Sequence, residues 1–423
     1  MRPGANPARL RVVALADTDS YVKWAAALLG SRADAVTPSL LVVQTPLVVS
    51  DAQLSAALAG SGLEDHAVRR MDYAGLLTAL RAAQPDAVLI AARGPLVRVL
   101  ARLVATLEPR PVIVTGLPGI SIPATRKAVF YRTQCDLFVL HSLREVRDFT
   151  ALAARLGVSA RFALSRLPFA QVGAAARVQH PVPGGTDLVF AAQAIVPRER
   201  RERERVVRML RDAARADPTR RVVVKVRAMA GERQTHHERD DYAGLIAALG
   251  ETPPNLVLSS APMARALERA EGLVTVSSTA AIEAVARGIP VIALDTFGVD
   301  EALINTVFEG SGLFGGEDRA IARDFRHPRP EWLCENYFHA ASEDDWVERL
   351  GALTALRRRG HLPGREPLAR RGGALRDAFE RKQVLGREDR TLSGALAFAV
   401  GAPARAVLLV LRGMRRPVHA AHP

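Results

Sequence analysis

The sequence predicts an α/β protein of two Rossmann-like, doubly wound domains that face each other across a cleft. Short apolar runs alternate with segments of helical spacing in both halves, which is typical of parallel sheets with crossover helices. The chain has 423 residues, more than one ordinary core accommodates. A Pro- and Gly-rich stretch, QHPVPGG, interrupts the pattern near the middle. We therefore expect an N-terminal, acceptor-side domain at residues 1–178, a linker at 179–186, a second domain at 187–360 and a helical extension at 361–423.

The composition is that of a soluble globular protein, with 48% apolar and 24% charged residues. A net charge of +14 favours contact with phosphorylated ligands or an anionic membrane surface. Acidic residues interrupt the basic ones in the Arg-rich helix expected at Arg198–Arg215, so we expect no nucleic-acid partner. Cys135 and Cys334 form no metal-type spacing, and the N-terminus has too short an apolar run for a secretory signal. These features predict a cytoplasmic protein.

In the first half, polar residues follow predicted strands. The run Arg11–Ala16 leads to Asp17 and Asp19, and the run Asp136–Leu140 leads to His141. Because the carboxyl ends of parallel strands form the ligand-binding edge of such a sheet, these three side chains are candidate acid–base groups. Two alternatives stay open: Asp19 as a helix N-cap, and His141 as a hydrogen-bonded packing residue.

A rigid loop follows the predicted strand Pro111–Thr115. It contains Gly116 and Gly119 among prolines, so its backbone can approach a ligand closely. It has neither the GxGxxG spacing of a dinucleotide site nor the lysine of a Walker A motif. We expect the loop to lie near the ligand.

The most informative stretch is VTVSSTAAIEAVARGIPVIAL at Val274–Leu294. It predicts a strand, a hydroxyl-bearing turn, a helix and a second strand, which form one βαβ unit. Ser277, Ser278 and Thr279 stand where the helix begins. A helix start offers unpaired N–H groups and a partial positive charge to a phosphate or carboxylate. The alternative is an ordinary N-cap.

A basic strand precedes this unit. Alternation within Arg221–Arg227 places Lys225 and Arg227 on one face. A polar loop with His236 follows, and its adjacent histidines lack the HExxH spacing, so we expect neither a metal nor another cofactor.

The last part of the chain predicts surface helices at Trp332–Ala340 and Asp344–Arg359. The stretch Thr391–Arg416 is apolar, but Pro403 and Arg405 interrupt it. A spanning helix needs about 20 uninterrupted apolar residues, so we expect a docked or membrane-interfacial segment instead.

Two doubly wound halves, a Pro/Gly boundary and a strand–SST–helix–GxPVI unit together resemble the GT-B glycosyltransferases. The sequence is most similar to an uncharacterised bacterial glycosyltransferase family, and more distantly to capsule-polysaccharide, Kdo and sialic acid transferases. The resemblance implies that the second half binds a nucleotide sugar, with the Ser277–Thr279 turn on the donor's phosphate or carboxylate and Glu283 near its ribose. Distant relatives have a His-Pro pair where Val226 and Arg227 follow the strand lysine here.

The resemblance also implies a reaction: metal-independent transfer of a sugar from a nucleotide donor to a cell-surface glycan or lipid-linked acceptor. CMP-linked ulosonic or sialic acids are the first donors to test. Backbone N–H groups with Lys225 or Arg227 would stabilise the departing phosphate, and a first-domain base, preferably Asp19, would activate the acceptor. A sugar-nucleotide epimerase of the same architecture and a non-catalytic protein of a glycan pathway are the alternatives.

Overall fold

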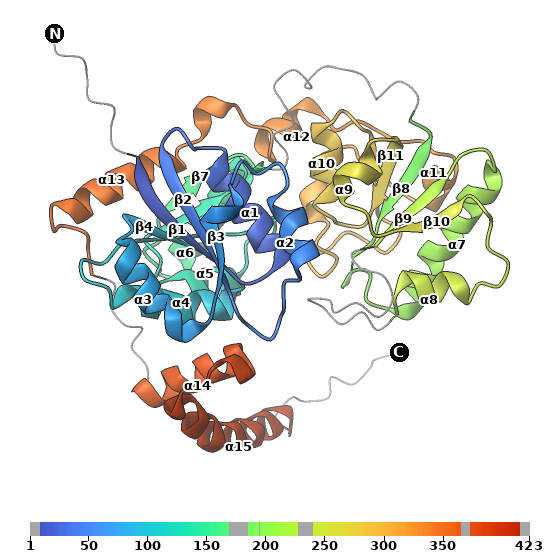
Figure 1. Ribbon diagram of the computed structural model, residues 1–423. Helices are drawn as coiled ribbons and strands as arrows, with labels where there is room; N and C mark the ends of the chain where they lie inside the picture. Colours follow the sequence, from blue (N-terminus) through green and yellow to red (C-terminus); the bar gives the residue numbers. More distant parts are fainter. Residues whose placement is uncertain (1–8, 169–184, 194, 227–239, 365–372, 415–423) are drawn as a thin grey trace, which may run out of the picture.

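The computed structural model describes residues 9–168, 185–193, 195–226, 240–364 and 373–414. Within them the chain forms two parallel sheets, each flanked by helices, in two domains that lie side by side (Figure 1).

The first sheet has seven strands in the order β3-β2-β1-β4-β5-β6-β7, and every neighbouring pair is parallel. Its strands β4 and β5 are buried along their whole length, as helices on both faces of a parallel sheet require. The strands are β1 (Leu10–Ala16), β2 (Val36–Val43), β3 (Val68–Met71), β4 (Ala87–Ala91), β5 (Val112–Gly116), β6 (Leu137–Leu140) and β7 (Phe162–Leu164). The helices are α1 (Asp19–Gly30), α2 (Asp51–Leu58), α3 (Tyr73–Ala83), α4 (Gly94–Ala105), α5 (Arg126–Arg132) and α6 (Leu143–Arg155).

The second sheet has six strands in the order β10-β9-β8-β11-β12-β13, again all parallel. The strands are β8 (Asp187–Ala191), β9 (Val222–Lys225), β10 (Leu256–Ser259), β11 (Ala270–Thr275), β12 (Val291–Leu294) and β13 (Phe314–Gly315). The helices are α7 (Arg200–Ala216), α8 (Tyr242–Ala247), α9 (Met263–Leu267), α10 (Ala280–Ala286) and α11 (Glu317–Ile321).

Both sheets share one winding order. Counted from its own first strand, each reads third, second, first, fourth, fifth and sixth, and the first sheet adds a seventh strand. The winding direction therefore reverses between β1 and β4 and again between β8 and β11. Ligands of open α/β sheets bind outside the carboxyl ends of the strands at such switch points. The predicted class of two doubly wound domains is confirmed.

The chain returns to the first domain after the second sheet, through α12 (Pro330–Glu335) and α13 (Trp346–Arg358). The predicted surface helix is confirmed for α13, which exposes Glu348 and Arg349 to solvent. Its residues Trp346, Leu350 and Leu353 recur at helical spacing and are buried in the core of the first domain. By its packing α13 therefore belongs to the first domain, although the sequence pattern placed residues 187–360 together.

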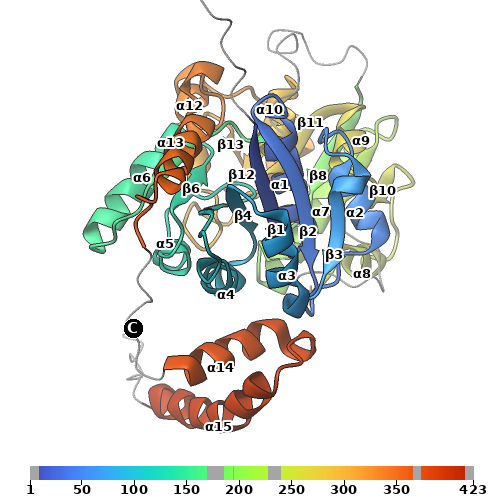
Figure 2. The same ribbon diagram turned by 60° about the vertical axis from the view of Figure 1, so that its left-hand side comes forward.

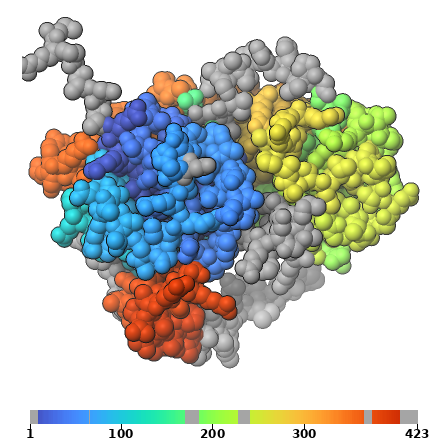
Figure 3. Space-filling model, viewed as in Figure 1, coloured from blue at the N-terminus to red at the C-terminus, as the bar shows by residue number. Residues whose placement is uncertain are grey.

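The helices α14 (Gly373–Leu385) and α15 (Leu392–Met414) form a hairpin against the first domain (Figures 1 and 2). Figure 3 shows this hairpin, in red, against the blue surface of that domain. Arg102 of α4 binds Asp377 at 2.6 Å and Glu380 at 3.0 Å, and Leu385 is fully buried in a first-domain apolar cluster. Among the described helices, none has the length and apolar character to cross a membrane.

Candidate functional site

The two domains meet at the carboxyl edges of their sheets. Lys23 of α1 binds Glu283 of α10 with 3.0 Å between Nζ and Oε1. The loop after β5 lies against the turn before α10, because a Cβ at Gly119 would stand only 2.6 Å from Oγ1 of Thr279. Ile122 of the same loop is buried in an apolar cluster of the second domain. The predicted glycine loop and the predicted hydroxyl turn therefore lie at the same domain interface.

Ser277 bridges the switch point of the second sheet. It follows β11, and its N–H donates to Oε1 of Gln193, which follows β8, at 2.9 Å. The amide nitrogen of Gln193 lies 3.1 Å from Oγ of Ser277. Ser277 is buried, so this pair fixes the turn in place. Sequence analysis missed Gln193, although it is a polar residue after the strand DLVFAA and the strand-end criterion applied elsewhere would have found it.

The next two hydroxyls are partly exposed. The N–H of Ser278 donates to Oγ1 of Thr275 at 3.1 Å, and Oγ of Ser278 accepts from the N–H of Ala280 at 3.2 Å. Thr279 makes no side-chain capping bond to α10. The cap alternative therefore describes Ser278 in part, whereas the Thr279 hydroxyl is directed at the loop of the first domain.

The other predicted donor residues have different surroundings. Glu283 is buried and forms the interdomain ion pair with Lys23. Lys225 ends β9, where its buried ammonium donates to the carbonyl of Val226. Arg227 and His236 lie outside the described residues.

Asp17 lies at the switch point of the first sheet. It follows β1, is fully buried, and accepts from Nε of Arg93 at 2.7 Å and from the Arg93 N–H at 3.3 Å. Arg93 follows β4, so this pair spans the switch point as Gln193 and Ser277 do in the other domain. Burial raises the pKa of Asp17, and Arg93 partly opposes that rise.

Asp19 is the first residue of α1 and is partly exposed. The N-cap of this helix is Thr18, so the N-cap alternative does not describe Asp19. Of the two predicted aspartates, Asp19 is the one that solvent or a ligand can reach.

His141 is fully buried at the end of β6. Its Nε2 accepts from the Trp24 indole at 2.7 Å and its Nδ1 lies 2.8 Å from the carbonyl of Ser165, which fits a neutral ring with the proton on Nδ1. Burial lowers the pKa of His141 to about 4. This arrangement matches the packing alternative. Gly116 is buried against the same Trp24 ring.

A buried carboxyl group that the sequence did not single out connects these parts. Glu145 of α6 accepts from the N–H groups of Ser121 at 2.9 Å and His141 at 2.8 Å, and from the hydroxyl of Tyr337 at 2.7 Å. Burial raises the pKa of Glu145 to about 7. The only sequence signal here is an S-x-x-E pattern, which predicts a helix start and nothing about partners 24 and 192 residues away.

No group of three or more His, Cys, Asp or Glu side chains is arranged for a metal ion within the described part of the chain. Both cysteines are free thiols.

Three solved structures show the same fold at low sequence identity. S. aureus MnaA with UDP has a TM-score of 0.52 and 11% identity, covering 85% of this chain and 99% of that chain. A structure described as a putative UDP-N-acetylglucosamine 2-epimerase from Listeria monocytogenes has a TM-score of 0.51 and 12% identity, covering 85% and 98%. The UDP-GlcNAc 2-epimerase from Methanocaldococcus jannaschii has a TM-score of 0.50 and 9% identity, covering 81% and 99%. No curated protein sequence matches the chain.

A family model matches residues 12–353. This span begins in β1, contains both switch points and the whole domain interface, and ends within α13, before the hairpin of α14 and α15. The match therefore spans most of both domains. The chain belongs to the family described as "Putative glycosyltransferase (DUF6716)", which confirms the resemblance to GT-B glycosyltransferases.

Proposed function

We propose that the protein transfers a sugar from a nucleotide-sugar donor to a cell-surface glycan or lipid-linked acceptor, without a metal ion. One observation carries the proposal: the hydroxyl turn Ser277–Thr279 is fixed at the switch point of the second sheet and lies against the Gly119 loop of the first domain. A donor on this turn would have its reactive end at the domain boundary, where an acceptor from the other side can reach it.

The turn supplies the groups that a leaving phosphate needs. The hydroxyls of Ser278 and Thr279 are partly exposed, and Lys225 ends a strand of the same sheet. Donors already oriented toward the developing charge stabilise it without reorganising. UDP is the nucleotide of the S. aureus relative, so UDP-sugars join CMP-linked sugars as the first donors to test.

The base belongs to the first domain in this proposal. Asp17 is committed to Arg93 and His141 to Trp24 and Ser165, whereas Asp19 is partly exposed at the start of α1. Asp19 would accept the proton of the acceptor hydroxyl.

The membrane part of the proposal rests on α15. Leu392, Leu396 and Val400 are spaced by four residues, so they lie on one face of the helix, and all three are exposed. An exposed apolar face on a chain of net charge +14 suits a peripheral position on an anionic cytoplasmic membrane surface. Replacing Leu396 and Val400 with Glu should abolish co-sedimentation with anionic vesicles, and unchanged co-sedimentation would remove this part.

Calorimetric titration with UDP-, GDP- and CMP-sugars tests the donor site. Wild type should bind one nucleotide class, and Ser278→Ala should weaken that binding by about tenfold, because one hydrogen bond to a charged group is lost. Thr106→Ala is the matched control, since Thr106 is an exposed hydroxyl that donates within α4, away from the interface. Binding of no nucleotide, or equal binding by Ser278→Ala, would sink the proposal.

Sugar-nucleotide epimerisation is the second candidate, because structures described as epimerases share the fold over more than four-fifths of the chain. NMR of a bound donor, first without and then with an added acceptor, separates the two. A new sugar epimer indicates an epimerase, and sugar transferred to an added acceptor indicates a transferase. Binding without any turnover would favour the non-catalytic protein instead.

A further inference from the structure

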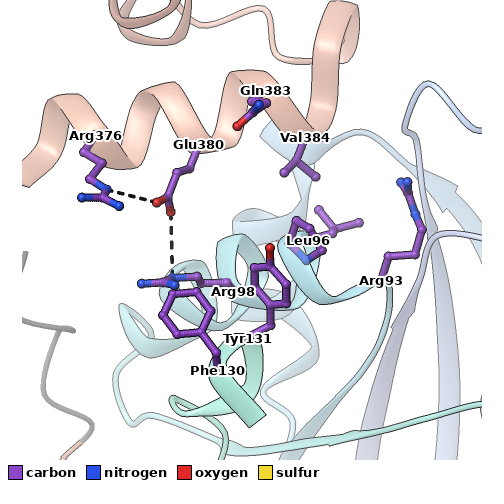
Figure 4. Close-up of a pocket in the computed structure, with 10 residues that line it drawn as sticks. Arg93, Leu96, Arg98, Phe130, Tyr131, Arg376, Glu380, Gln383 and Val384 are labelled. Carbon is purple, nitrogen blue, oxygen red and sulfur yellow. Dashed lines mark hydrogen bonds and ion pairs between the residues drawn. The ribbon is translucent and has the colours of Figure 1, made fainter. Parts of the chain in front are cut away.

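A cavity of about 500 Å³ lies between α4, α5 and α14 (Figure 4). The hairpin forms its upper wall with Arg376 and Glu380, and the first domain forms the lower wall with Arg98 and two aromatic residues, Phe130 and Tyr131. None of the predicted site residues lines it.

Arg98 is the unusual member of this cavity. It is only 4% exposed, and its Nε has no hydrogen-bond partner within the described structure. Its guanidinium lies 4.3 Å from the ring centroid of Phe130 and its Nε 3.9 Å from Oε2 of Glu380, beyond hydrogen-bond distance. A buried, charged donor without an acceptor is costly, so the site lacks one acceptor.

The lining is cationic. Arg93, Arg98 and Arg376 face one carboxylate, Glu380. Arg93 is paired with Asp17, whereas Arg98 and Arg376 share the single carboxylate of Glu380, at 3.9 Å and 3.3 Å, so the lining keeps one unbalanced positive charge. An anion in the cavity would balance it.

The start of α4 adds an aromatic wall. The helix begins at Gly94 without a side-chain cap, and Tyr131 covers this end, since a Cβ at Gly94 would stand 2.4 Å from the ring. The Arg93 N–H at this end already donates to Asp17, and Pro95 has no N–H, so this end contributes the Tyr131 ring to the cavity and Arg98 contributes the charge. The cavity therefore combines an anion seat with a surface for a ring or an apolar group.

The position of the cavity connects it with the first switch point. Arg93 both lines the cavity and holds Asp17 at that point. The opposite wall, α14, lies outside residues 12–353, which match the family. The family match therefore covers only the first-domain wall of the cavity.

We propose that this cavity binds the phosphate of a phosphorylated acceptor, with Arg98 as its principal contact and Phe130 and Tyr131 against the attached group. The acceptor role rests on the proposed transferase function. A phosphate suits the site because its several acceptor oxygens can meet the guanidinium groups of Arg98 and Arg376.

Calorimetric titration of the full-length protein with phenyl phosphate tests the proposal. Wild type should bind it, phenol should not bind, and benzoate should bind more weakly. Arg98→Met should weaken phenyl phosphate binding by about tenfold or more, because a buried charged contact is lost. Arg81→Met is the matched control: Arg81 is exposed on α3 and does not line the cavity, so binding should stay within about twofold.

Three outcomes would overturn the assignment: no binding by wild type, equal binding by Arg98→Met, or benzoate binding as tightly as phenyl phosphate. If Arg98→Met does not fold, Arg376→Met on the exposed rim serves instead, with a smaller expected loss. Nucleotide-sugar titration of the same variants separates the two proposals. Retained nucleotide binding with lost phenyl phosphate binding supports the second site, whereas absent nucleotide binding in every variant refutes only the donor site and with it the acceptor role.

Discussion

The switch points of the two sheets have one topology and opposite chemistry. In the first domain the polar pair is charged: buried Asp17 with Arg93. In the second the pair is neutral: Gln193 with Ser277. The charged pair holds two strand ends together and engages both oxygens of the buried Asp17 carboxylate with Arg93. The neutral pair fixes one hydroxyl and leaves Ser278 and Thr279 partly exposed at the interface.

This difference shows what a polar residue at a strand end means. Its position follows from topology, but its availability depends on the partner across the switch point. An ion pair in a buried place has its charges already satisfied, whereas an amide and a hydroxyl organise a turn without fixing the residues beyond it. In the proposed reaction the first domain therefore contributes the carboxylate of Asp19, which follows Asp17 by two residues and is partly exposed.

Replacing Asp19 and Asp17, one at a time, should give the largest effects, on turnover and on stability respectively. Asp19→Asn should lower kcat by about 10²–10⁴-fold with unchanged thermal stability, since general-base catalysis contributes that much. Asp17→Asn should lower the free energy of unfolding by about 1–3 kcal/mol, because it leaves Arg93 without its carboxylate. Turnover assays and chemical denaturation measure the two effects, and Asp51→Asn, an exposed aspartate at the start of α2, is the control. Full activity of Asp19→Asn would show that another residue acts as the general base.

Disturbing the contact between the Gly119 loop and the hydroxyl turn should give the next largest effect on turnover. Gly119→Ala places a methyl group within 2.6 Å of Oγ1 of Thr279, so either the Thr279 side chain rotates or the loop and the turn separate, and both displace the hydroxyl. A misplacement of about 1 Å costs roughly 100-fold in turnover when both sides take part in the reaction. Thr279→Ala in the same chain should restore much of that loss if its hydroxyl is not itself needed. Wild-type turnover in Gly119→Ala alone would show that the interface is not the reaction site.

Sequence periodicity predicted most of the fold because each βαβ unit is a local pattern. It misassigned α13, because the spacing of Trp346, Leu350 and Leu353 identifies a buried face but not the domain that covers it. The candidate site divides in the same way. Strand ends located Asp17, His141 and Ser277 correctly at the sheet edges. The contact between His141 and Trp24 joins residues 117 positions apart, and no local pattern specifies it.

Two buried titratable groups, the His141 ring and the Glu145 carboxyl group, predict that the stability of the fold depends on pH. Burial raises the pKa of Glu145 from 4.5 to about 7, so between these values the folded state holds a proton that the unfolded state loses, and stability falls as pH rises. Burial lowers the pKa of His141 from 6.5 to about 4, so between these values stability rises with pH. The two slopes oppose each other between pH 4.5 and 6.5.

Glu145→Gln should therefore expose the slope of His141 alone. Its free energy of unfolding should rise between pH 5 and 6.5, by at most about 1.4 kcal/mol per pH unit, while wild type stays nearly flat. Urea denaturation at about pH 5 and about pH 6.5 measures the free energy of unfolding of both proteins. Glu251→Gln, at an exposed position, should behave like wild type. A flat profile for Glu145→Gln would mean that His141 is protonated in the folded protein.

Breaking the ion pair between Lys23 and Glu283 should have the smallest effect on stability. It also distinguishes a ribose-binding role of Glu283 from a purely structural one. The Lys23 side chain is 40% exposed, and such pairs contribute about 0–1 kcal/mol, so Lys23→Met and Glu283→Gln should each change stability little. Nucleotide binding separates the two roles of Glu283. If its carboxylate contacts ribose, Glu283→Gln weakens binding by about tenfold, whereas Lys23→Met leaves binding unchanged or tighter because the carboxylate loses its competitor. Equal, small losses in both variants would identify Glu283 as an interdomain contact, and the donor would then depend on the hydroxyl turn alone.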